Sequence, residues 1–430
     1  MVNTADKTKA PVVLLIATFD TKAEEALYLK EKIESLGCGV LVMDTGILVE
    51  TGKPTDVTRH QVAEAGGASI DELIASRDKG RCIGTMLKGA SLLAKRLYAE
   101  GEFQGIISIG GAQGTDIGTA AMRELPFGVP KFMVSTVASG RATFGPFVGT
   151  KDIAMLHSVA DIQGINFITR RVLDNAAAAI CGMVMNAAVS DPRTSDRPAV
   201  ALSMLGTVTQ GALRAMKLLS AKGYDAIAFH QNGTGGIAME DMIREGIFKG
   251  VLDLNLHELG DSVVNGLHAS IRDYRLTSAG ALGVPQVVAP GSVNYAVLGP
   301  VETLAPEMLK RKYIVHNSFL TLVRLSSEEI EKAAIVVAER LNAAKGPTHV
   351  FIPLRGFSYP DREGGPHWDP EGNRVFIRTL KARLAPSIPY DELDWHINDD
   401  PFIDAIVNEL VRLMNPPASH SPQLAAGKRA

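Results

Sequence analysis

Short apolar runs alternate with amphipathic helical segments along most of the chain, and this pattern restricts the fold more than any other feature. Residues 11–18 (PVVLLIAT) are rich in Val, Leu and Ile, as in a strand buried on both faces. Residues 22–36 then place Ala26, Leu29 and Ile33 at helical spacing. Further strands are predicted at 39–44, 105–111 and 131–136. Strands that alternate with helices predict an α/β fold with a parallel sheet covered on both faces.

The same pattern starts again after a polar segment with two prolines at 190–198. The sequence PVVLLIATFDT resembles the later PAVALSMLGT, and a glycine, Gly37 or Gly223, precedes the next strand in each copy. Strands are then predicted at 225–229, 251–256, 285–290 and 348–353, and a helix at 326–343. We predict two Rossmann-like domains with parallel sheets, residues 1–194 and 195–414, and a disordered tail at 415–430. An internal duplication is one interpretation of the repeat, and chance similarity is the other.

Composition restricts the class of function. The 430 residues carry 44 Lys and Arg against 47 Asp and Glu, a net charge of −3, and only 6% are aromatic, so neither a nucleic-acid surface nor an anionic membrane is an expected partner. The N-terminus has no apolar signal segment, and the longest near-apolar run, 176–189, is shorter than the ~20 residues of a membrane span. The three cysteines form no CxxC motif. We expect a cytoplasmic protein with reduced thiols.

Three loops of small polar residues follow predicted strands of the N-terminal domain, whereas the common nucleotide motifs GxxxxGK[ST] and GxGxxG do not occur. The loops are TFDTK at 18–22, GGAQGTD at 110–116 and STVASG at 135–140. Each can present hydroxyl and backbone N–H groups at the carboxyl edge of a parallel sheet, where α/β proteins bind ligands. Together they favour a phosphate-bearing ligand, although an ordinary helix start explains any one of them alone.

The second domain carries candidate residues of its own. The loop HQNGTGG contains Gly233, Thr234, Gly235 and Gly236, a candidate substrate-binding cradle for a second anion. Carboxylate and imidazole groups transfer protons, and guanidinium groups bind anions. On this basis the candidate catalytic residues are His230, Glu258, Arg355 and His396. For each of them, a helix cap or a structural ion pair is the alternative. The Gly- and Pro-rich segment 354–372 is a candidate functional loop because it is long for a connection.

A helix is predicted at 166–188. Its later half is apolar all round, which predicts burial on every side. The small residues at 176–179 and Gly182 would allow close contact with another domain or subunit, and ordinary core packing is the alternative.

Several motifs occur in a fixed order between residues 11 and 414: ATFDTK, IGGAQGT, VGTKDIAMLHSVADIQGIN, NAAAAICGMV, HxxGTGG, PQVVAPG, VHNS, PLRG and HINDDPF. With them the chain resembles a widespread family of uncharacterised bacterial proteins related to the ATP-binding N-terminal domain of the tomato mosaic virus resistance protein. The resemblance implies two Rossmann-like subdomains, a homodimer, and ATP with Mg²⁺ bound in the first subdomain.

The resemblance also implies which residues bind the cofactors. The implied nucleotide-binding residues are Thr18, Asp20, Thr21, Lys22, Gly110, Gly111, Gln113, Gly114, Thr115, Ser135, Thr136, Ser139, Gly140, Gly149 and Thr150. Asp20 and Asp152 are the implied Mg²⁺ contacts. The chain departs from the family's pattern at 141–147 and at Lys151, close to the implied phosphate site.

Two functional hypotheses follow. In the first, the protein is an enzyme that uses ATP and Mg²⁺ for phosphoryl or adenylyl transfer to a small anionic metabolite held by the second domain. In the second, it is a non-catalytic module in which ATP orders a dimer that a protein partner recognises.

Overall fold

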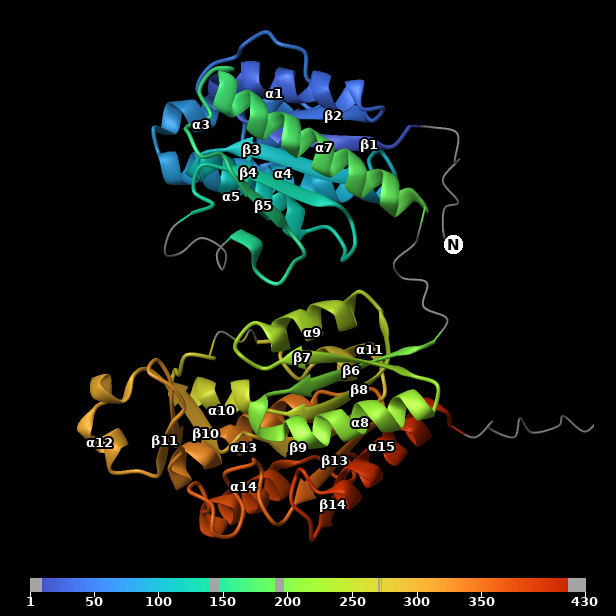
Figure 1. Ribbon diagram of the computed structural model, residues 1–430, viewed down its shortest axis with the longest axis vertical. Coiled ribbons are helices and arrows are strands. Elements are labelled where there is room, and N and C mark those ends of the chain that lie inside the picture. The colour runs from blue at the N-terminus through green and yellow to red at the C-terminus, as the bar shows by residue number, and fades with distance from the viewer. Residues whose placement is uncertain (1–9, 140–146, 190–196, 270, 272, 417–430) are drawn as a thin grey trace, which may run out of the picture. The chain divides into compact units, whose positions relative to one another are not determined.

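The computed structural model describes residues 10–139, 147–189, 197–269, 271 and 273–416. The chain divides into two compact units, residues 1–194 (unit 1) and 195–430 (unit 2), each shown in Figure 1. The boundary falls within the polar segment that the sequence identifies as a linker. The predicted disordered tail lies outside the described residues from position 417 onward.

Unit 1 alternates strands and helices around one parallel sheet, sheet A. Its elements are β1 (Val12–Ala17), α1 (Phe19–Ser35), β2 (Gly39–Asp44), α2 (Arg59–Gly66), α3 (Ile70–Ser76), α4 (Lys79–Ala99), β3 (Gly105–Gly110), α5 (Ala112–Arg123), β4 (Lys131–Ser135), β5 (Ala154–His157) and α7 (Phe167–Val189). The five strands lie in the order β2-β1-β3-β4-β5, and every neighbouring pair is parallel. The predicted parallel α/β architecture is therefore confirmed.

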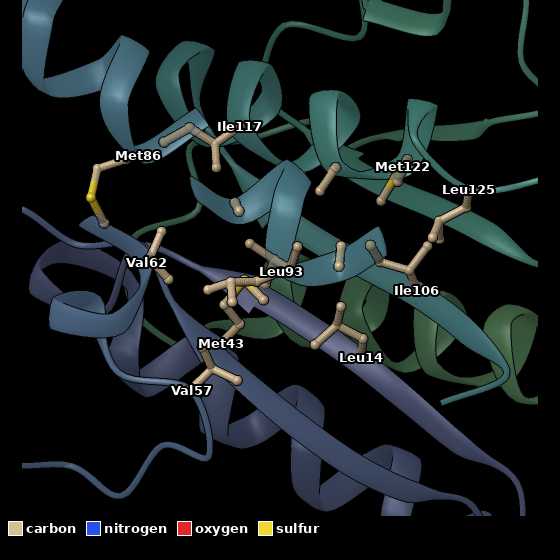
Figure 2. Close-up of a cluster of buried hydrophobic side chains, with 14 of the residues drawn as sticks. Leu14, Met43, Val57, Val62, Met86, Leu93, Ile106, Ile117, Met122 and Leu125 are labelled. Carbon is tan, nitrogen blue, oxygen red and sulfur yellow. The ribbon is translucent and has the colours of Figure 1, made fainter. Parts of the chain in front are cut away.

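Helices cover both faces of sheet A, with α1 and α7 on one face and α2 to α5 on the other (Figure 1). Figure 2 shows the second face, where Leu14 and Ile106 of the sheet meet Val62 of α2, Leu93 of α4 and Ile117 of α5. Successive strand residues point to opposite faces, so a sheet buried on both sides requires apolar residues at nearly every strand position. This requirement explains the continuous apolar runs in the sequence.

Helix α7 corrects one prediction, because it is not buried on every side. Phe167 is 83% exposed and Met185 40% exposed, and Ala178 and Gly182 between them are also exposed. The side that packs on sheet A is buried and consists of Leu173, Ala176, Ala177, Ile180 and Val184. A helix that lies on a sheet buries one side only, so the apolar residues on its outer side remain uncovered.

Unit 2 is built on a second parallel sheet, sheet B. Its elements are β6 (Ala199–Met204), η1 (Gly206–Val208), α8 (Thr209–Ala221), β7 (Asp225–His230), α9 (Gly235–Arg244), β8 (Phe248–Asn255), α10 (His257–Val263), α11 (Ser278–Leu282), β9 (Gln286–Gly291), β10 (Tyr295–Leu298), η2 (Val301–Thr303), α12 (Pro306–Leu309), β11 (Tyr313–Val315), β12 (Thr321–Arg324), α13 (Ser327–Asn342), β13 (Thr348–Pro353), α14 (Pro370–Arg383), β14 (Tyr390–Leu393) and α15 (Asp400–Met414). The six strands of sheet B lie in the order β14-β13-β9-β8-β6-β7, and a small antiparallel sheet, β10-β12-β11, is inserted after β9. Helices α8 and α15 cover one face of sheet B, and α9 to α11, α13 and α14 cover the other.

The two large sheets share one strand order. When β6, β7, β8, β9 and β13 are matched to β1 to β5, sheet B repeats the order of sheet A and adds β14 at one edge. An internal duplication predicts this repetition. In each sheet the strand order reverses beside the first strand, between β1 and β3 and between β6 and β8, and loops that diverge at such a switch point leave room for a ligand.

Among the described helices, none combines the length and apolar character needed to cross a lipid bilayer.

Candidate functional site

Two helix N-termini flank the switch point of sheet A. Helix α1 follows β1 on one face of the sheet, and α5 follows β3 on the other. Neither N-cap residue, Thr18 or Gly111, caps its helix through a side-chain hydrogen bond. The first N–H of α1, that of Phe19, already donates to Asp44 Oδ1 at 3.0 Å. Because the first N–H groups of a helix point outward and carry its positive partial charge, the start of α5, which has no such partner within the described residues, is the one that suits an anion.

The first of these helices begins earlier than predicted, at Phe19 instead of residue 22, and is kinked at Lys22. Thr21 N and Lys22 N both donate to the carbonyl oxygen of Thr18, at 3.1 and 2.8 Å, and form a tight turn before the regular helix. The hydroxyls of Thr18 and Thr21 lie 3.1 Å apart. The polar residues that suggested a loop therefore form the first turn of the helix.

Lys22 is nearly buried, with 9% of its surface exposed, and its Nζ donates to Gln163 Oε1 at 3.3 Å. Within the described part of the chain it forms no ion pair, and neighbouring Glu25 accepts the N–H of Gly164 instead at 2.5 Å. Buried charges in proteins are usually paired. This ammonium group, beside the start of α1, therefore suits an anionic ligand.

Hydrogen bonds tie the remaining loops to the same edge of sheet A. Thr115 Oγ1 lies 2.7 Å from Ser135 Oγ and so connects α5 to the end of β4. Ser139 Oγ lies 3.2 Å from His157 Nε2 at the end of β5. The structure thus brings the three predicted loops together, and it adds His157 and Gln163. The sequence analysis missed both, although the motif LHSVADIQ that contains them was recognised as distinctive.

Glycines of the second loop have different roles. A Cβ on Gly110 would lie 2.7 Å from the Cα of Gly114, so these two residues allow close packing of strand and helix. A Cβ on Gly111 would meet nothing closer than Thr136 Oγ1 at 3.6 Å, which leaves room for a side chain there. Gln113 lies half-buried in the first turn of α5.

The two residues implied as Mg²⁺ contacts are not close together. Asp20 Oδ2 accepts the N–H groups of Ile47 and Leu48 at 2.8 and 2.9 Å, beside the start of α1. Asp152 Oδ1 lies 2.8 Å from Lys131 Nζ, where β4 and β5 begin. The segment around Asp152 precedes β5, so it lies at the amino edge of sheet A, opposite Asp20.

Gly149 and Thr150 lie away from the nucleotide loops for the same reason. A Cβ on Gly149 would be 3.3 Å from Arg123 Cδ, at the C-terminal end of α5. Gly140 and residues 141–146 lie outside the described residues. Among the residues that the structure describes, no group of three or more His, Cys, Asp or Glu side chains is arranged to hold a metal ion.

In unit 2, the glycine loop before α9 already holds an anion, the carboxylate of Glu258. Glu258 Oε1 accepts the N–H groups of Gly233 and Gly236 at 2.8 and 3.2 Å. A Cβ on Gly236 would lie 1.8 Å from Glu258 Oε2, so only glycine fits there. A Cβ on Gly235 would be 1.8 Å from the carbonyl oxygen of His230, and Thr234 is exposed beside it. The predicted substrate cradle is thus occupied by the chain itself.

Arg275 holds Glu258 in place at the centre of a buried charge cluster. Its guanidinium pairs with Asp253 at 2.6 and 2.9 Å, with Glu258 at 3.3 Å and with Glu240 at 3.4 Å, and it is fully buried. Burial raises the pKa of Glu258, although Arg275 and two backbone donors oppose the shift. These contacts assign Glu258 to the support of the fold, since no exposed face of its carboxylate remains.

The other three catalytic candidates do not meet at one place. Arg355 is exposed and pairs with Asp394 at 2.9 and 2.7 Å, whereas His396 is buried and its Nε2 lies 3.0 Å from the carbonyl oxygen of Ser358. Burial lowers the pKa of His396. Arg355 follows β13 and His396 follows β14, whereas His230 ends β7 at the far edge of sheet B. Four strand spacings from β13 to β7 amount to about 19 Å.

A histidine pair that the sequence analysis did not identify lies after β8. His257 Nε2 is 3.1 Å from His268 Nδ1, and burial lowers the pKa of His257 to about 3. Asp261 accepts the N–H groups of His268 and Val297, each at 2.7 Å, and burial raises its pKa to about 6. The spacing of His257 and Asp261 along one helical turn was visible in the sequence, but His268 is brought close only by the turn after α10.

Comparison with known proteins matches both units to a single family. Residues 11–189 match the description "Uncharacterised protein family (UPF0261) N-terminal domain", and residues 197–414 match the corresponding C-terminal domain. The chain is 40% identical to a UPF0261 protein of Clostridium tetani over 403 residues, which cover 94% of this chain and 98% of that protein. It is 34% identical to UPF0261 protein RA0729 of Rhizobium meliloti, with 94% and 99% covered. It is also 31% identical to the ToMV resistance protein Tm-1(GCR237) of Solanum lycopersicum, over 96% of this chain and 57% of the tomato protein.

Proposed function

The chain belongs to the UPF0261 family, and from this premise we propose that unit 1 binds ATP with Mg²⁺ at the carboxyl edge of sheet A, between β1 and β3. The observation that carries the proposal is the N-terminus of α5 at Gly111, which lacks a side-chain cap and lies at the switch point, together with the nearly buried Lys22 at the start of α1. Helix N-termini at this position bind the phosphates of nucleotides in other doubly wound α/β folds.

Lys22 and the neighbouring hydroxyls support the same ligand. The ammonium group of Lys22 would neutralise phosphate charge, with Gln163 as its partner when no phosphate is present. Thr18, Thr21 and Thr136 would donate hydroxyl hydrogen bonds to phosphate oxygens. His157, with Ser139, lies farther along the edge and would face the nucleoside part.

Mg²⁺ fits this site only if phosphate oxygens of the nucleotide supply some of its ligands. Asp20 is the one implied carboxylate at the correct edge of the sheet, whereas Asp152 lies at the opposite edge and is paired with Lys131. Mg²⁺ commonly takes one or two protein carboxylates and completes its shell with water and phosphate oxygens. We therefore assign Asp20 alone to Mg²⁺, and the bound ion would neutralise charge on the phosphates.

Gly111→Asp tests the nucleotide site. A carboxylate at the N-cap should leave the free protein as stable as before or slightly more so, because Asp is a good N-cap residue. The same carboxylate should repel phosphate and fill the space in front of α5. ATP at about 100 times its dissociation constant adds roughly 2.7 kcal/mol to the stability of a protein that binds it. We expect this Mg²⁺-dependent rise in melting temperature in the wild type and its loss in Gly111→Asp.

The matched control is Gly111→Ala, whose methyl group fits within the available space and should retain the rise. If ATP stabilises wild type and Gly111→Asp equally, the nucleotide does not bind at α5. If no nucleotide stabilises the wild type, the proposed function fails.

We propose nucleotide binding and assign no chemical reaction, because Glu258 and His396 lie in buried contacts that support the fold and Arg355 is paired with Asp394 on the surface. The exposed side of α7 favours the second hypothesis, a nucleotide-binding dimer that a protein partner recognises. Phe167, Ala178, Gly182 and Met185 follow one another along that side, and a second copy of the chain could cover it.

Gly182→Arg is expected to convert such a dimer to a monomer. No heavy atom lies within 4 Å of a Cβ placed on Gly182, so the arginine should not disturb the fold but would obstruct a close helix contact. Gly84→Arg is the matched control, because Gly84 is also an exposed helical glycine with open space around it, on α4. Light scattering after size-exclusion chromatography measures the mass, and equal masses for the two variants would exclude α7 as the interface.

A further inference from the structure

Unit 2 has a switch point of its own, between β6 and β8, and the side chains that gather there carry no charge. Thr207 follows β6, Asn255 ends β8 and Ser292 follows β9. Thr207 Oγ1 lies 2.6 Å from Ser292 Oγ and 2.9 Å from the hydroxyl of Tyr295, and Asn255 Nδ2 donates to Ser292 Oγ at 2.9 Å. We refer to Thr207, Asn255 and Ser292 as the neutral floor.

The backbone of the neutral floor is strained. Ser292 has φ of +57°, a left-handed conformation that a residue with a side chain rarely adopts, and it is fully buried. The N–H of Ser292 donates to the carbonyl oxygen of Phe357 at 2.7 Å, and the N–H of Tyr359 donates to that of Thr207 at 2.8 Å. Such conformations persist where surrounding contacts impose them, and they concentrate at ligand sites.

Polar atoms beside the floor lack partners. Ser358 Oγ and Asn294 Oδ1 are buried and make no hydrogen bond within the described part of the chain. Ser358 lies between Phe357, whose carbonyl oxygen binds Ser292, and Tyr359, whose N–H binds Thr207. Asn294 follows Ser292 by two positions. Buried polar atoms are normally satisfied by protein, water or a ligand, so these two call for a further hydrogen-bonding group.

The floor adjoins open surface. Gly206 is exposed, and a Cβ built on it would meet no heavy atom within 4 Å. The backbone N–H of Tyr359, from the loop after β13, binds the carbonyl oxygen of Thr207, and its side chain is 61% exposed. Exposed aromatic rings are amphipathic contact groups, so Tyr359 is a candidate to contact the apolar face of a sugar ring.

From this geometry we propose that unit 2 binds an uncharged, hydroxyl-bearing small molecule, a sugar or a polyol, on the neutral floor. The nearby charged groups face opposite charges, Arg275 with Asp253 and Arg324 with Asp361 at 3.5 Å, although Arg324 Nη1 and Asp361 Oδ1 make no hydrogen bond within the described residues. The three side chains of the floor carry no charge that would attract an ionic ligand. A ligand hydroxyl group both donates and accepts, so it could donate to Asn294 Oδ1 and bond to Ser358 Oγ, the two atoms without partners. This site differs from the second-domain anion site expected from the sequence and does not depend on ATP in unit 1.

Saturation-transfer NMR on the full chain tests the proposal with D-ribose, D-glucose and glycerol, and with inorganic phosphate followed by ³¹P line width as the anionic probe. We expect transfer to at least one neutral probe and no broadening of phosphate when unit 1 carries Gly111→Asp. Thr207→Val should abolish the transfer. Thr348→Val should retain it, because Thr348 is a hydrogen-bonded hydroxyl at the opposite, amino edge of sheet B.

Absence of transfer from every neutral probe to the wild type would overturn the proposal, and so would equal transfer in the Thr207→Val and Thr348→Val variants. In the first case the floor would be an enclosed structural network completed by water. The melting-temperature shift with ATP is measured separately, so failure of this site and failure of the nucleotide site are distinguishable.

Discussion

Arg275→Met is expected to destabilise unit 2 by about 3–5 kcal/mol at neutral pH, the cost of leaving buried charges without their partner. The variant removes the cation that forms ion pairs with three buried carboxylates, those of Asp253, Glu240 and Glu258. The methionine side chain is similar in length to the apolar part of arginine, so packing changes little. The carboxylates left without a cation should therefore account for most of the lost unfolding free energy.

Tryptophan fluorescence during urea denaturation measures this loss selectively, because both tryptophans of the chain, Trp368 and Trp395, lie in unit 2. Lowering the pH should recover part of the stability, since protonated carboxyl groups no longer need the cation. Arg355→Met is the control, because its ion pair with Asp394 is exposed and its loss should have little effect. Equal denaturation midpoints for the two variants would contradict the role given to Arg275.

Asp261→Asn is expected to alter the pH dependence of the same transition. Burial raises the pKa of Asp261 to about 6, against 3.8 for the ordinary group, so the native state holds this proton more tightly than the unfolded chain does. The resulting stability is complete below pH 3.8 and is lost as the pH rises through about 6. The loss corresponds to about two pH units, or about 3 kcal/mol. Asparagine resembles the protonated acid and does not titrate.

The unfolding free energy of the wild type minus that of Asp261→Asn should therefore fall by about 2.4 kcal/mol between pH 4 and pH 8. The buried histidines His257, His367 and His396 have lowered pKa values and give the opposite slope, with stability lost as the pH falls. They are present in both proteins, so their contribution cancels in the difference. A difference that stays constant across this pH range would show that Asp261 is already ionised at low pH.

The sequence was sufficient to predict the parallel sheets, because a strand that is buried on both faces needs a continuous apolar run such as residues 12–17. It was not sufficient for α7. Apolar residues on the outer side of a helix look the same whether or not another surface covers them, so Met185 and Gly182 suggested burial that unit 1 alone does not provide.

The common location of the loops at Thr18, Gly111 and Ser135 could be predicted, because each motif follows a strand directly and parallel strands end together at one edge. The location of Asp152 could not, because it is close to the third loop in sequence but precedes β5 and so lies at the other edge. Sequence also cannot show that the anion held by Gly233 and Gly236 is the chain's own Glu258, since the two segments meet only in the folded sheet.

The carboxylate of Glu258 at the start of α9 has a consequence for how the two halves of the molecule can respond to the cell. A group attached to the same chain competes at an effective concentration that dissolved phosphate or nucleotide does not match, because no translational freedom is lost when it binds. The α9 cradle is therefore insensitive to metabolite levels, whereas the start of α5 holds no carboxylate of the chain within the described residues and remains available to them.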